Sequence, residues 1–270
     1  MPSETKLRPI TSPRLIRLGD GDAAPPRGLP RGRNLEDATD EQLERIKDLQ
    51  KVLYADGRFA LLIVLQGRDA SGKDGTVRKV FSGVNPMGCQ VTSFKAPTEL
   101  EREYDYLWRI HQHVPPRRMI GIFNRSHYED VIVPSVHESV PRKLLSQRYD
   151  QINEFERMLD QNSVVTLKFF LHVSRDEQKK RLIERLKDRK KNWKFRPGDL
   201  DDRALWGDYT RAYRDAIARC STSWARWYIV PADDEDARDL LVARKIADTL
   251  ESLDLRYPRL DPELAGIKIQ

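Results

Sequence analysis

The fold is decided by the stretch "ALLIVLQGRDASGKDG", Ala60 to Gly75, which begins as a continuous apolar run and ends in a glycine-rich segment. A run of this kind is typical of a strand that is buried on both faces of a parallel sheet. Gly67 and Gly72 are followed by Lys73, the spacing of a loop whose backbone N–H groups hold phosphate at a helix N-terminus. The usual Ser or Thr, whose hydroxyl binds Mg²⁺, is replaced by Asp74. The stretch predicts phosphate chemistry with an unusual residue beside the lysine.

Apolar runs and amphipathic stretches alternate along the rest of the chain. The runs that we expect to be strands are residues 59–66, 89–94, 118–124, 164–173 and 226–232. The expected helices are residues 73–81, 98–113, 141–159, 174–190, 202–220 and 234–253, and a further helix begins with Thr39 as its N-cap. Strands that alternate with helices imply crossover connections, so we predict an α/β fold with a parallel sheet covered on both faces.

The whole chain is long enough to bury one core, with 270 residues of which 39% are hydrophobic. We expect an extended arm rich in Pro and Arg over residues 1–38 and one phosphotransferase domain over residues 39–270. No apolar stretch approaches the roughly 18 residues of a membrane helix, and the first residues lack the apolar centre of a signal peptide. Since Cys89 and Cys220 have no metal-binding spacing, we expect a cytoplasmic protein without a membrane partner.

Basic residues are concentrated in one segment, "KKRLIERLKDRKKNWKFR", residues 179–196. It holds ten Lys or Arg against two acidic residues, a local charge of +8 in a chain whose formal charge is +6, so the remainder sums to about −2. Such a patch either binds a polyanion or is a solvated helix face. Arg181, Arg185 and Arg189 are spaced four apart, so we expect them on one helix face, where a row of guanidinium groups suits a linear chain of phosphates.

A second polar motif follows the apolar run that ends in Asn124. Strand ends of this kind commonly offer an acidic metal ligand in phosphate-loop enzymes. Because Asn124 replaces that acid, Asp69 and Asp130 are the candidates for holding the metal. Arg125 is placed to bind phosphate oxygens with its planar guanidinium, and a simple pair with Glu129 across a helical turn is the alternative.

Four blocks occur in order along the chain: "GRDASGKDGTVRKVFSGVNPMG", "SFKAPTELEREYDYLWRIHQHVP", "IGIFNRSHYEDV" and "KNWKFRPGDLDDRALWGDY". From about Thr39 to Ile246 the sequence resembles the polyphosphate kinase 2 family, which moves phosphate between inorganic polyphosphate and nucleotides. The resemblance implies a three-layer α/β/α P-loop kinase-like fold related to thymidylate kinase, with a helical lid at about residues 176–209. It also implies dependence on Mg²⁺, with Mn²⁺ as a substitute, and a homodimer or homotetramer. In this family Asp follows the loop lysine, which accounts for Asp74.

The candidate site residues follow from this resemblance and from the positions of the motifs. The catalytic candidates are Asp69, Lys73 and Arg125, and the metal candidates are Asp69 and Asp130. The phosphate-binding candidates are Gly67, Gly72, Asp74, Lys95, Arg185, Arg189 and Lys194. Asn124 and Glu129 are the nucleotide-binding candidates, and "NRSHYEDV" is similar to the subgroup that accepts both AMP and ADP. Asp69 is interpreted chiefly as a metal ligand or as an orienter of the acceptor, with general base as the alternative.

The predicted activity is reversible transfer of the terminal phosphoryl group between inorganic polyphosphate and AMP, ADP or ATP. An ATP-dependent nucleoside monophosphate kinase stays open as an alternative, although Asp74 and the length of the basic segment argue against it. A nucleic-acid-binding module would use the same patch on a phosphate backbone. Trp193 and Phe195 are expected to anchor the lid and not to stack on bases, so we expect no nucleic-acid partner.

Overall fold

The computed structural model describes residues 5–259, 261 and 262, and a five-stranded sheet forms its centre. The strands are β1 (Ala60–Gln66), β2 (Cys89–Ser93), β3 (Ile120–Asn124), β4 (Val164–His172) and β5 (Trp227–Pro231). They lie in the order β2-β3-β1-β4-β5, and every neighbouring pair is parallel. All residues of β1 are buried, as its unbroken apolar sequence predicts. The five predicted strands and the parallel sheet are confirmed.

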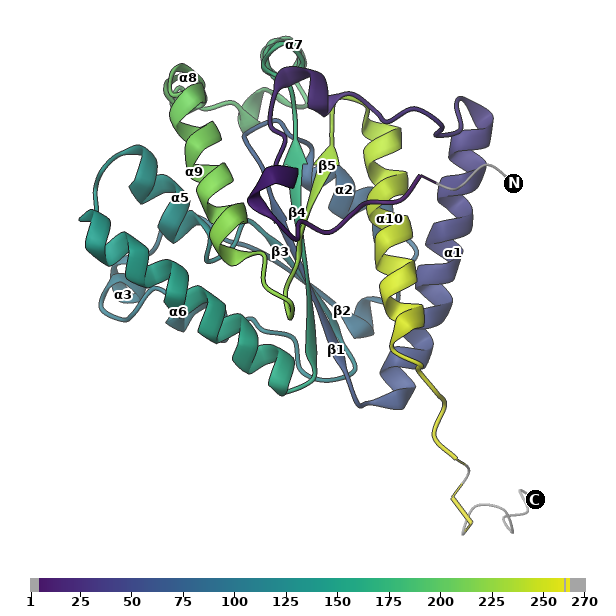
Figure 1. Ribbon diagram of the computed structural model, residues 1–270. Helices are drawn as coiled ribbons and strands as arrows, with labels where there is room; N and C mark the ends of the chain where they lie inside the picture. The colour runs from purple at the N-terminus through teal and green to yellow at the C-terminus, as the bar shows by residue number, and fades with distance from the viewer. Residues whose placement is uncertain (1–4, 260, 263–270) are drawn as a thin grey trace.

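Helices cover both faces of the sheet and give three layers (Figure 1). One face carries α1 (Arg33–Asp56), α2 (Lys73–Val80) and α10 (Glu235–Ser252), and the other carries α5 (Glu129–Val136), α6 (Arg142–Gln161) and α9 (Trp206–Cys220). The alternation of β1 side chains divides the core accordingly. Leu62 and Val64 join the apolar cluster under α6 and α9, whereas Leu61, Ile63 and Leu65 join the cluster under α1 and α10.

The remaining elements are short, apart from α7 (Arg175–Lys187), which follows β4. They are α3 (Glu99–Arg102), α4 (Trp108–His111), α8 (Gly198–Ala204) and four 3₁₀ turns, η1 (Pro13–Leu15), η2 (Asp20–Ala23), η3 (Pro86–Gly88) and η4 (Asn192–Lys194). The predicted single helix over residues 98–113 is wrong. Asp105 accepts hydrogen bonds from the backbone N–H groups of Leu107 and Trp108 at 2.9 and 3.1 Å, so its carboxylate begins a new turn and interrupts the helix.

The first long helix begins earlier than its sequence predicts. α1 starts at Arg33, and Thr39 lies inside it, buried, with its hydroxyl donating to the Leu35 carbonyl at 2.7 Å. The prediction of Thr39 as the N-cap is therefore wrong. The predicted apolar spacing holds, because Ile46 and Leu53 are buried against α10.

The N-terminal segment lies across the edge of the sheet near β5 (Figure 1). Ile10, Ile16 and Leu18 are buried in the core, and the Ile10 backbone N–H donates to the Trp227 carbonyl at 2.9 Å. The segment predicted as an extended arm is therefore anchored to the core by these three apolar side chains. Whether residues 1–38 form a unit apart from 39–270 stays a prediction, and residues 1–4, 260 and 263–270 lie outside the described residues.

Helices long and apolar enough to cross a membrane are absent from the described part of the chain.

Candidate active site

The loop from Gly67 to Gly72 joins the carboxyl end of β1 to the N-terminus of α2. It curls around the Lys73 ammonium, which donates to the Gly67 and Arg68 carbonyls at 2.7 and 3.0 Å. Lys73 is 8% exposed, and Ala70 at the crest of the loop has a left-handed φ of 62°. The strand, loop and helix that the phosphate motif requires are therefore present in the expected order.

Gly72 is required by its backbone and by a close neighbour. Its φ is 98°, and a Cβ added here would lie 1.9 Å from the Arg238 guanidinium. Gly67 is equally confined, because a Cβ would lie 2.7 Å from the Leu171 carbonyl oxygen. Both glycines fit their predicted place in the loop, and a phosphate contact at either stays a prediction.

Burial and, to a smaller extent, the nearby positive charge of Arg125 lower the pKa of Lys73 to about 8, against the opposing effect of Asp69. The ammonium is held by backbone carbonyls, and among the described residues no carboxylate is bonded directly to it. A phosphate bound at the loop would give the Lys73 ammonium an anionic partner.

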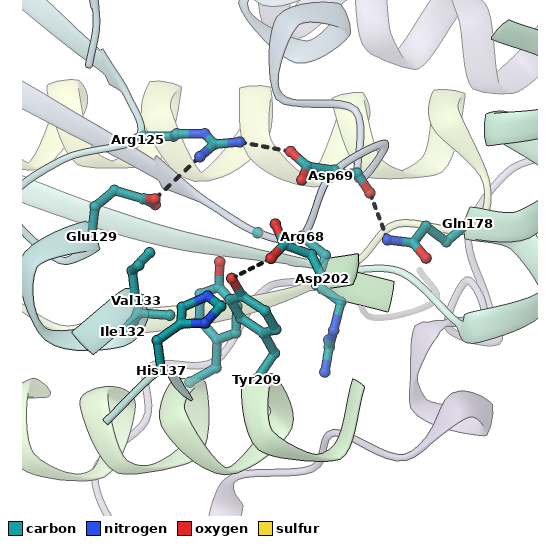
Figure 2. A pocket seen from close by; sticks show the side chains of 12 residues that line it. Arg68, Asp69, Arg125, Glu129, Ile132, Val133, His137, Gln178, Asp202 and Tyr209 are labelled. Carbon is teal, nitrogen blue, oxygen red and sulfur yellow. Dashed lines mark hydrogen bonds and ion pairs between the residues drawn. The ribbon is translucent and has the colours of Figure 1, made fainter. Parts of the chain in front are cut away.

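Arg125 follows β3 and links the phosphate loop to α5. Its guanidinium bonds Asp69 at 2.6 Å and Glu129 at 3.2 Å, as Figure 2 shows. The predicted pair with Glu129 is thus present, and Asp69 joins it as a third member. Arg125 has a φ of 63°, and its backbone N–H donates to the Leu65 carbonyl at 3.0 Å. A left-handed conformation at a residue other than glycine costs energy, and such residues cluster at active sites and ligand-binding loops.

Asp69, Arg125 and Glu129 line a pocket of about 170 Å³. Its other walls come from the phosphate loop, α5 and its C-cap, α7, α8 and α9, through side chains that the sequence reasoning did not single out. These are Arg68, Ile132, Val133, His137, Gln178, Asp202, Tyr209 and Tyr213, together with the backbone of Gly67. Two of them lie within "GDLDDRALWGDY", but the motif alone does not show which of its residues face inward.

Gln178 and Arg68 connect the pocket to the lid segment, residues 176–209. Gln178 donates to the Asp69 carbonyl at 3.1 Å. The Arg68 guanidinium lies over the Trp206 ring, 4.0 Å from its centre, and contacts the Thr210 hydroxyl. Burial lowers the pKa of Arg68 to about 10. Phosphate loop and lid segment are therefore in direct contact.

Asp74 joins three of the predicted motifs. One carboxylate oxygen accepts from the Asn124 amide at 2.7 Å, and the other pairs with Lys194 at 3.1 Å. Burial raises the pKa of Asp74, but the bonds from Asn124 and Lys194 outweigh burial and lower it overall. The residue that replaces Ser or Thr thus links the loop, the end of β3 and the lid segment.

Asp130, the second metal candidate, is bonded elsewhere. It pairs with Arg109 at 3.1 Å, and burial raises the pKa of its carboxyl despite that partner. Arg109 also donates to the Lys95 carbonyl at 2.8 Å, while the Lys95 side chain is exposed. The structure does not bring Asp130 to the pocket that Asp69 lines. Among the described residues no three or more His, Cys, Asp or Glu side chains are grouped to hold a metal ion.

The three arginines of the lid segment do not share one exposed face. Arg181 is buried and donates to the Ala70 and Ala232 carbonyls at 3.1 and 2.8 Å. Arg185 lies 4.0 Å from Asp199, and Arg189 is exposed beyond the end of α7. The predicted row is wrong because the first arginine fixes the phosphate loop and the helix ends before the third.

Trp193 does not anchor the lid as expected. Its side chain is 73% exposed, and its Nε1 donates to the Lys190 carbonyl within its own turn at 3.0 Å. Phe195 is only partly buried. The tip of the lid segment is therefore held mainly through Lys194 and Asp74.

Comparison with known proteins agrees with this geometry. A model of the polyphosphate kinase 2 family matches residues 31–258. An AMP/ADP-polyphosphate phosphotransferase of Meiothermus ruber is 52% identical over 225 residues, covering 83% of this chain and 84% of that protein. An ADP-polyphosphate phosphotransferase of Rhodopseudomonas palustris is 45% identical over 233 residues, covering 82% and 81%.

A solved structure extends the likeness to nearly the full length. The crystal structure of polyphosphate kinase 2 from Arthrobacter aurescens has a TM-score of 0.85 and 38% sequence identity, and 97% of each chain is covered. The three-layer α/β/α fold that the sequence predicts is confirmed by this match and by the parallel sheet. With the family model spanning most of its length and a relative more than half identical, the chain belongs to the polyphosphate kinase 2 family.

Proposed function

We propose that the protein transfers the terminal phosphoryl group of inorganic polyphosphate to AMP and to ADP, reversibly. The observation that carries the proposal is the pocket in which the phosphate loop, Arg125 and the lid segment meet. Both substrates, the polyphosphate and the nucleotide, carry several negative charges and must meet in this pocket. Transfer between phosphate oxygens passes through a loose transition state, so the protein mainly has to position the reactants and neutralise their charge.

Lys73 and Arg125 are the cations that we assign to the transferred group. Lys73 is bonded to the carbonyls of the loop. Arg125 follows β3 and lines the pocket, and its side chain is 40% exposed. Unit charges 4 Å apart repel by about 4 kcal/mol at an effective dielectric of 20, so each neutralised contact matters. The acceptor phosphate needs no strong base, because its second pKa is about 6. We therefore assign Asp69 to orienting the acceptor or to binding the metal.

Mg²⁺ suits this site through its donors. It prefers oxygen ligands and is commonly held by one or two carboxylates together with substrate phosphates, so a larger cluster of acidic residues is not needed. Asp69 lines the pocket, and Glu129 is the other carboxylate there that bonds Arg125. A bound Mg²⁺ would neutralise phosphate charge and help to orient the nucleotide and the polyphosphate relative to each other. Asp69 is the residue that we assign to it, and Asp130 is less suited because it pairs with Arg109.

The acceptor preference is proposed from Asn124 and Glu129. The Asn124 amide donates to Asp74 at 2.7 Å, where a carboxylate at position 124 would face a second carboxylate. Asn124 thus keeps the loop and β3 together without metal between them. Glu129 bonds Arg125 and borders the pocket, so it is placed to act on the acceptor side. We assign both AMP and ADP as acceptors on this arrangement and on the similarity of "NRSHYEDV" to the dual subgroup.

The basic residues at the lid tip are assigned to the polyphosphate chain. Lys190 and Arg189 are exposed and follow α7, and Lys194 reaches the phosphate loop through Asp74. A polymer that occupies the pocket with its terminal group can extend along this segment. Assembly as a homodimer or homotetramer and a cytoplasmic location stay predictions, and light scattering measures the first.

A donor comparison tests the function. The purified protein is given AMP or ADP with Mg²⁺ and either long-chain polyphosphate or ATP, and products are separated over time. We expect ADP and then ATP to form from AMP with polyphosphate. Turnover of AMP with ATP alone would identify a nucleoside monophosphate kinase and contradict the proposal, and conversion of ADP with AMP unchanged would contradict the dual acceptor.

A further inference from the structure

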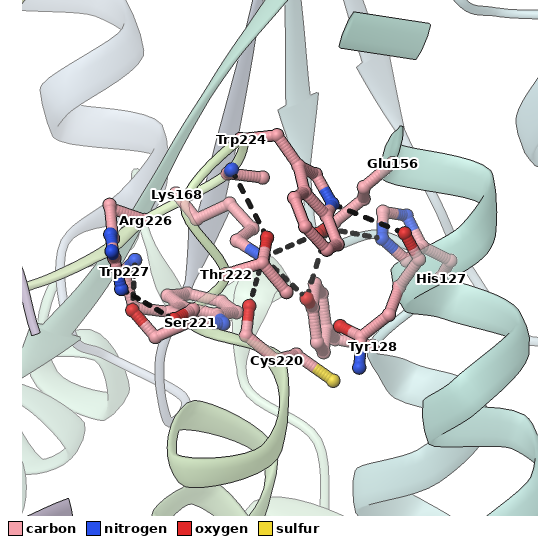
Figure 3. A network of polar contacts seen from close by, with 12 residues as sticks. His127, Tyr128, Glu156, Lys168, Cys220, Ser221, Thr222, Trp224, Arg226 and Trp227 are labelled. Atoms are coloured by element: carbon pink, nitrogen blue, oxygen red, sulfur yellow. Dashed lines mark hydrogen bonds and ion pairs between the residues drawn. The ribbon is translucent and has the colours of Figure 1, made fainter. Parts of the chain in front are cut away.

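A fully buried polar network joins His127 and Tyr128 to Glu156 and Lys168 (Figure 3). Its charged members are Glu156 of α6 and Lys168 of β4, each about 1% exposed or less. The Lys168 ammonium contacts Glu156, the Tyr128 hydroxyl at 2.8 Å and the Cys220 carbonyl at 2.6 Å. These three acceptors match the three protons of an ammonium group, so Lys168 is completely bonded.

The carboxylate at the centre binds two neighbouring residues of the catalytic segment. Glu156 accepts from the Tyr128 hydroxyl at 2.9 Å and contacts His127 Nε2 at 3.1 Å. His127 and Tyr128 are completely buried, and they lie between Arg125 and Glu129 in the chain. The network therefore bonds the middle of the segment 125–129, and the two ends of that segment, Arg125 and Glu129, line the pocket.

Stability does not explain such a network. Replacing a buried ion pair by apolar side chains of similar volume is often neutral or stabilising, whereas removing one partner alone is strongly destabilising. Burial raises the pKa of the Glu156 carboxyl, but Lys168 and His127 outweigh burial and lower it overall, so the carboxylate is charged. A charged group buried at this position points to a role in placing the residues that it bonds.

The segment above the network needs such support. Arg125 adopts a φ of 63°, which a residue with a side chain holds only where its surroundings impose it. Ser126, the next residue, is buried, and its hydroxyl accepts from the Tyr128 N–H at 3.2 Å. The backbone that carries Arg125 and Glu129 is therefore continuous with two residues that the network bonds, His127 and Tyr128.

We propose that Glu156, with Lys168, is a positioning residue that holds Arg125 and Glu129 in their orientation for phosphoryl transfer by binding His127 and Tyr128. The inference rests on the proposed function, and it adds two residues remote from substrate to the requirements of the reaction. A bond network of this kind affects the step in which Arg125 contacts developing charge more than it affects substrate binding.

The first test separates position from stability with two variants. Replacing both charges together, Glu156→Leu with Lys168→Met, is expected to keep the unfolding temperature near that of the wild type and to lower kcat at least tenfold, with KM for polyphosphate within about twofold. Glu156→Gln keeps an acceptor for His127 and Tyr128 while leaving Lys168 without its counter-charge. It is expected to lower the unfolding temperature and to keep kcat within about threefold.

A folded double variant with kcat within twofold of the wild type would overturn the proposal. If the double variant does not fold, Tyr128→Phe decides, because it removes only the phenol oxygen from the network. We expect a several-fold lower kcat for Tyr128→Phe at unchanged KM, and an unchanged kcat would overturn the proposal. Ile246→Val on α10, in the core on the other side of the sheet, is the control that loosens packing without reaching the segment.

A readout that does not need turnover separates this inference from the proposed function. Amide hydrogen exchange of the peptide covering residues 120–132 is expected to be at least tenfold faster in the double variant and unchanged in Ile246→Val. Exchange that stays unchanged in the double variant would overturn the positioning role. A wild type without polyphosphate-dependent turnover would overturn the function alone.

Discussion

Two sets of cations, at the phosphate loop and at the lid tip, differ in their surroundings. Lys73 and Arg181 are buried and donate to backbone carbonyls around the phosphate loop. Arg189 and Lys190 are exposed at the lid tip, and within the part of the chain that the structure describes neither forms an ion pair. The first set has fixed positions and completely defined partners, and the second has neither.

This difference indicates that the buried and the exposed cations have different roles. A buried cation that donates to carbonyl groups fixes the shape of the loop and is placed to bind a single phosphate. Its removal leaves buried carbonyl groups unpaired and therefore costs much free energy. An exposed cation adds to a field that attracts a polyanion, and its loss is small and depends on salt. The predictions that follow test this division, beginning with the largest effect.

Lys73→Ala is expected to lower kcat/KM by at least 10³-fold, about 4 kcal/mol, because the point charge at the transferred phosphate is lost. Steady-state kinetics with AMP and polyphosphate measures it, and circular dichroism shows whether the fold is kept. Lys79→Ala, in the same helix and on its exposed side, is the matched control and should match the wild type. A Lys73→Ala enzyme within tenfold of the wild type would remove Lys73 from the chemistry.

Arg181→Lys is expected to lower the free energy of unfolding by about 2–4 kcal/mol. The planar guanidinium joins the carbonyls of Ala70 in the phosphate loop and of Ala232 after β5, and an ammonium cannot reach both. Denaturant unfolding measures the change. Lys180→Ala, the exposed neighbour, serves as the control. An unchanged midpoint in Arg181→Lys would show that these bonds do not hold the loop.

The pH dependence distinguishes the buried lysine from the exposed cations. With a pKa of about 8 in the folded protein, Lys73 loses its charge as the pH rises past this value, and kcat/KM should fall about tenfold per pH unit. The same group binds more protons in the unfolded chain between about pH 8 and its ordinary 10.5, so its contribution to the free energy of unfolding rises with pH over that range.

Activity and the Lys73 contribution to the free energy of unfolding should thus move in opposite directions above pH 8. Parallel kinetic and unfolding measurements between pH 7 and 9.5 check this. A kcat/KM that stays flat to pH 9.5 would mean that the lysine keeps its proton in the free enzyme.

Sequence reasoning succeeded where local patterns decide the structure. The buried strand, the glycines and Lys73 occupy adjacent positions, so their geometry follows from short-range rules. The inward direction of Arg181 could not be predicted, because its acceptors at Ala70 and Ala232 come together only when α7 packs against two strand ends. The pairing of Glu156 with Lys168 depends in the same way on how α6 lies on β4.

The double variant Arg189→Ala with Lys190→Ala is expected to raise KM for long-chain polyphosphate several-fold and to reduce its salt dependence. The unfolding midpoint should not change, because both side chains are exposed. Lys47→Ala with Lys51→Ala on α1 removes the same charge outside the lid segment and is the control. Equal effects of the two pairs would show that only net charge matters.

Lys194→Met is expected to have the smallest effect. Lys194 is intermediate between the two sets, with its side chain 33% exposed, an ion pair with Asp74 and the centre of the Trp193 ring 5.3 Å from its ammonium. Partly exposed ion pairs contribute about 0–1 kcal/mol, so we expect a two- to fivefold rise in KM for polyphosphate and little change in stability. Arg196→Ala, exposed two residues further on, is the matched control. A loss as large as that of Lys73→Ala would place Lys194 among the fixed cations.

The most direct test of the account is a crystal structure of the protein with AMP and a non-transferable polyphosphate analogue. We predict a phosphate within hydrogen-bonding distance of the loop N–H groups and Lys73, with the polymer continuing toward Arg189 and Lys190. A polymer bound away from this loop, with the lid tip turned elsewhere, would contradict the account.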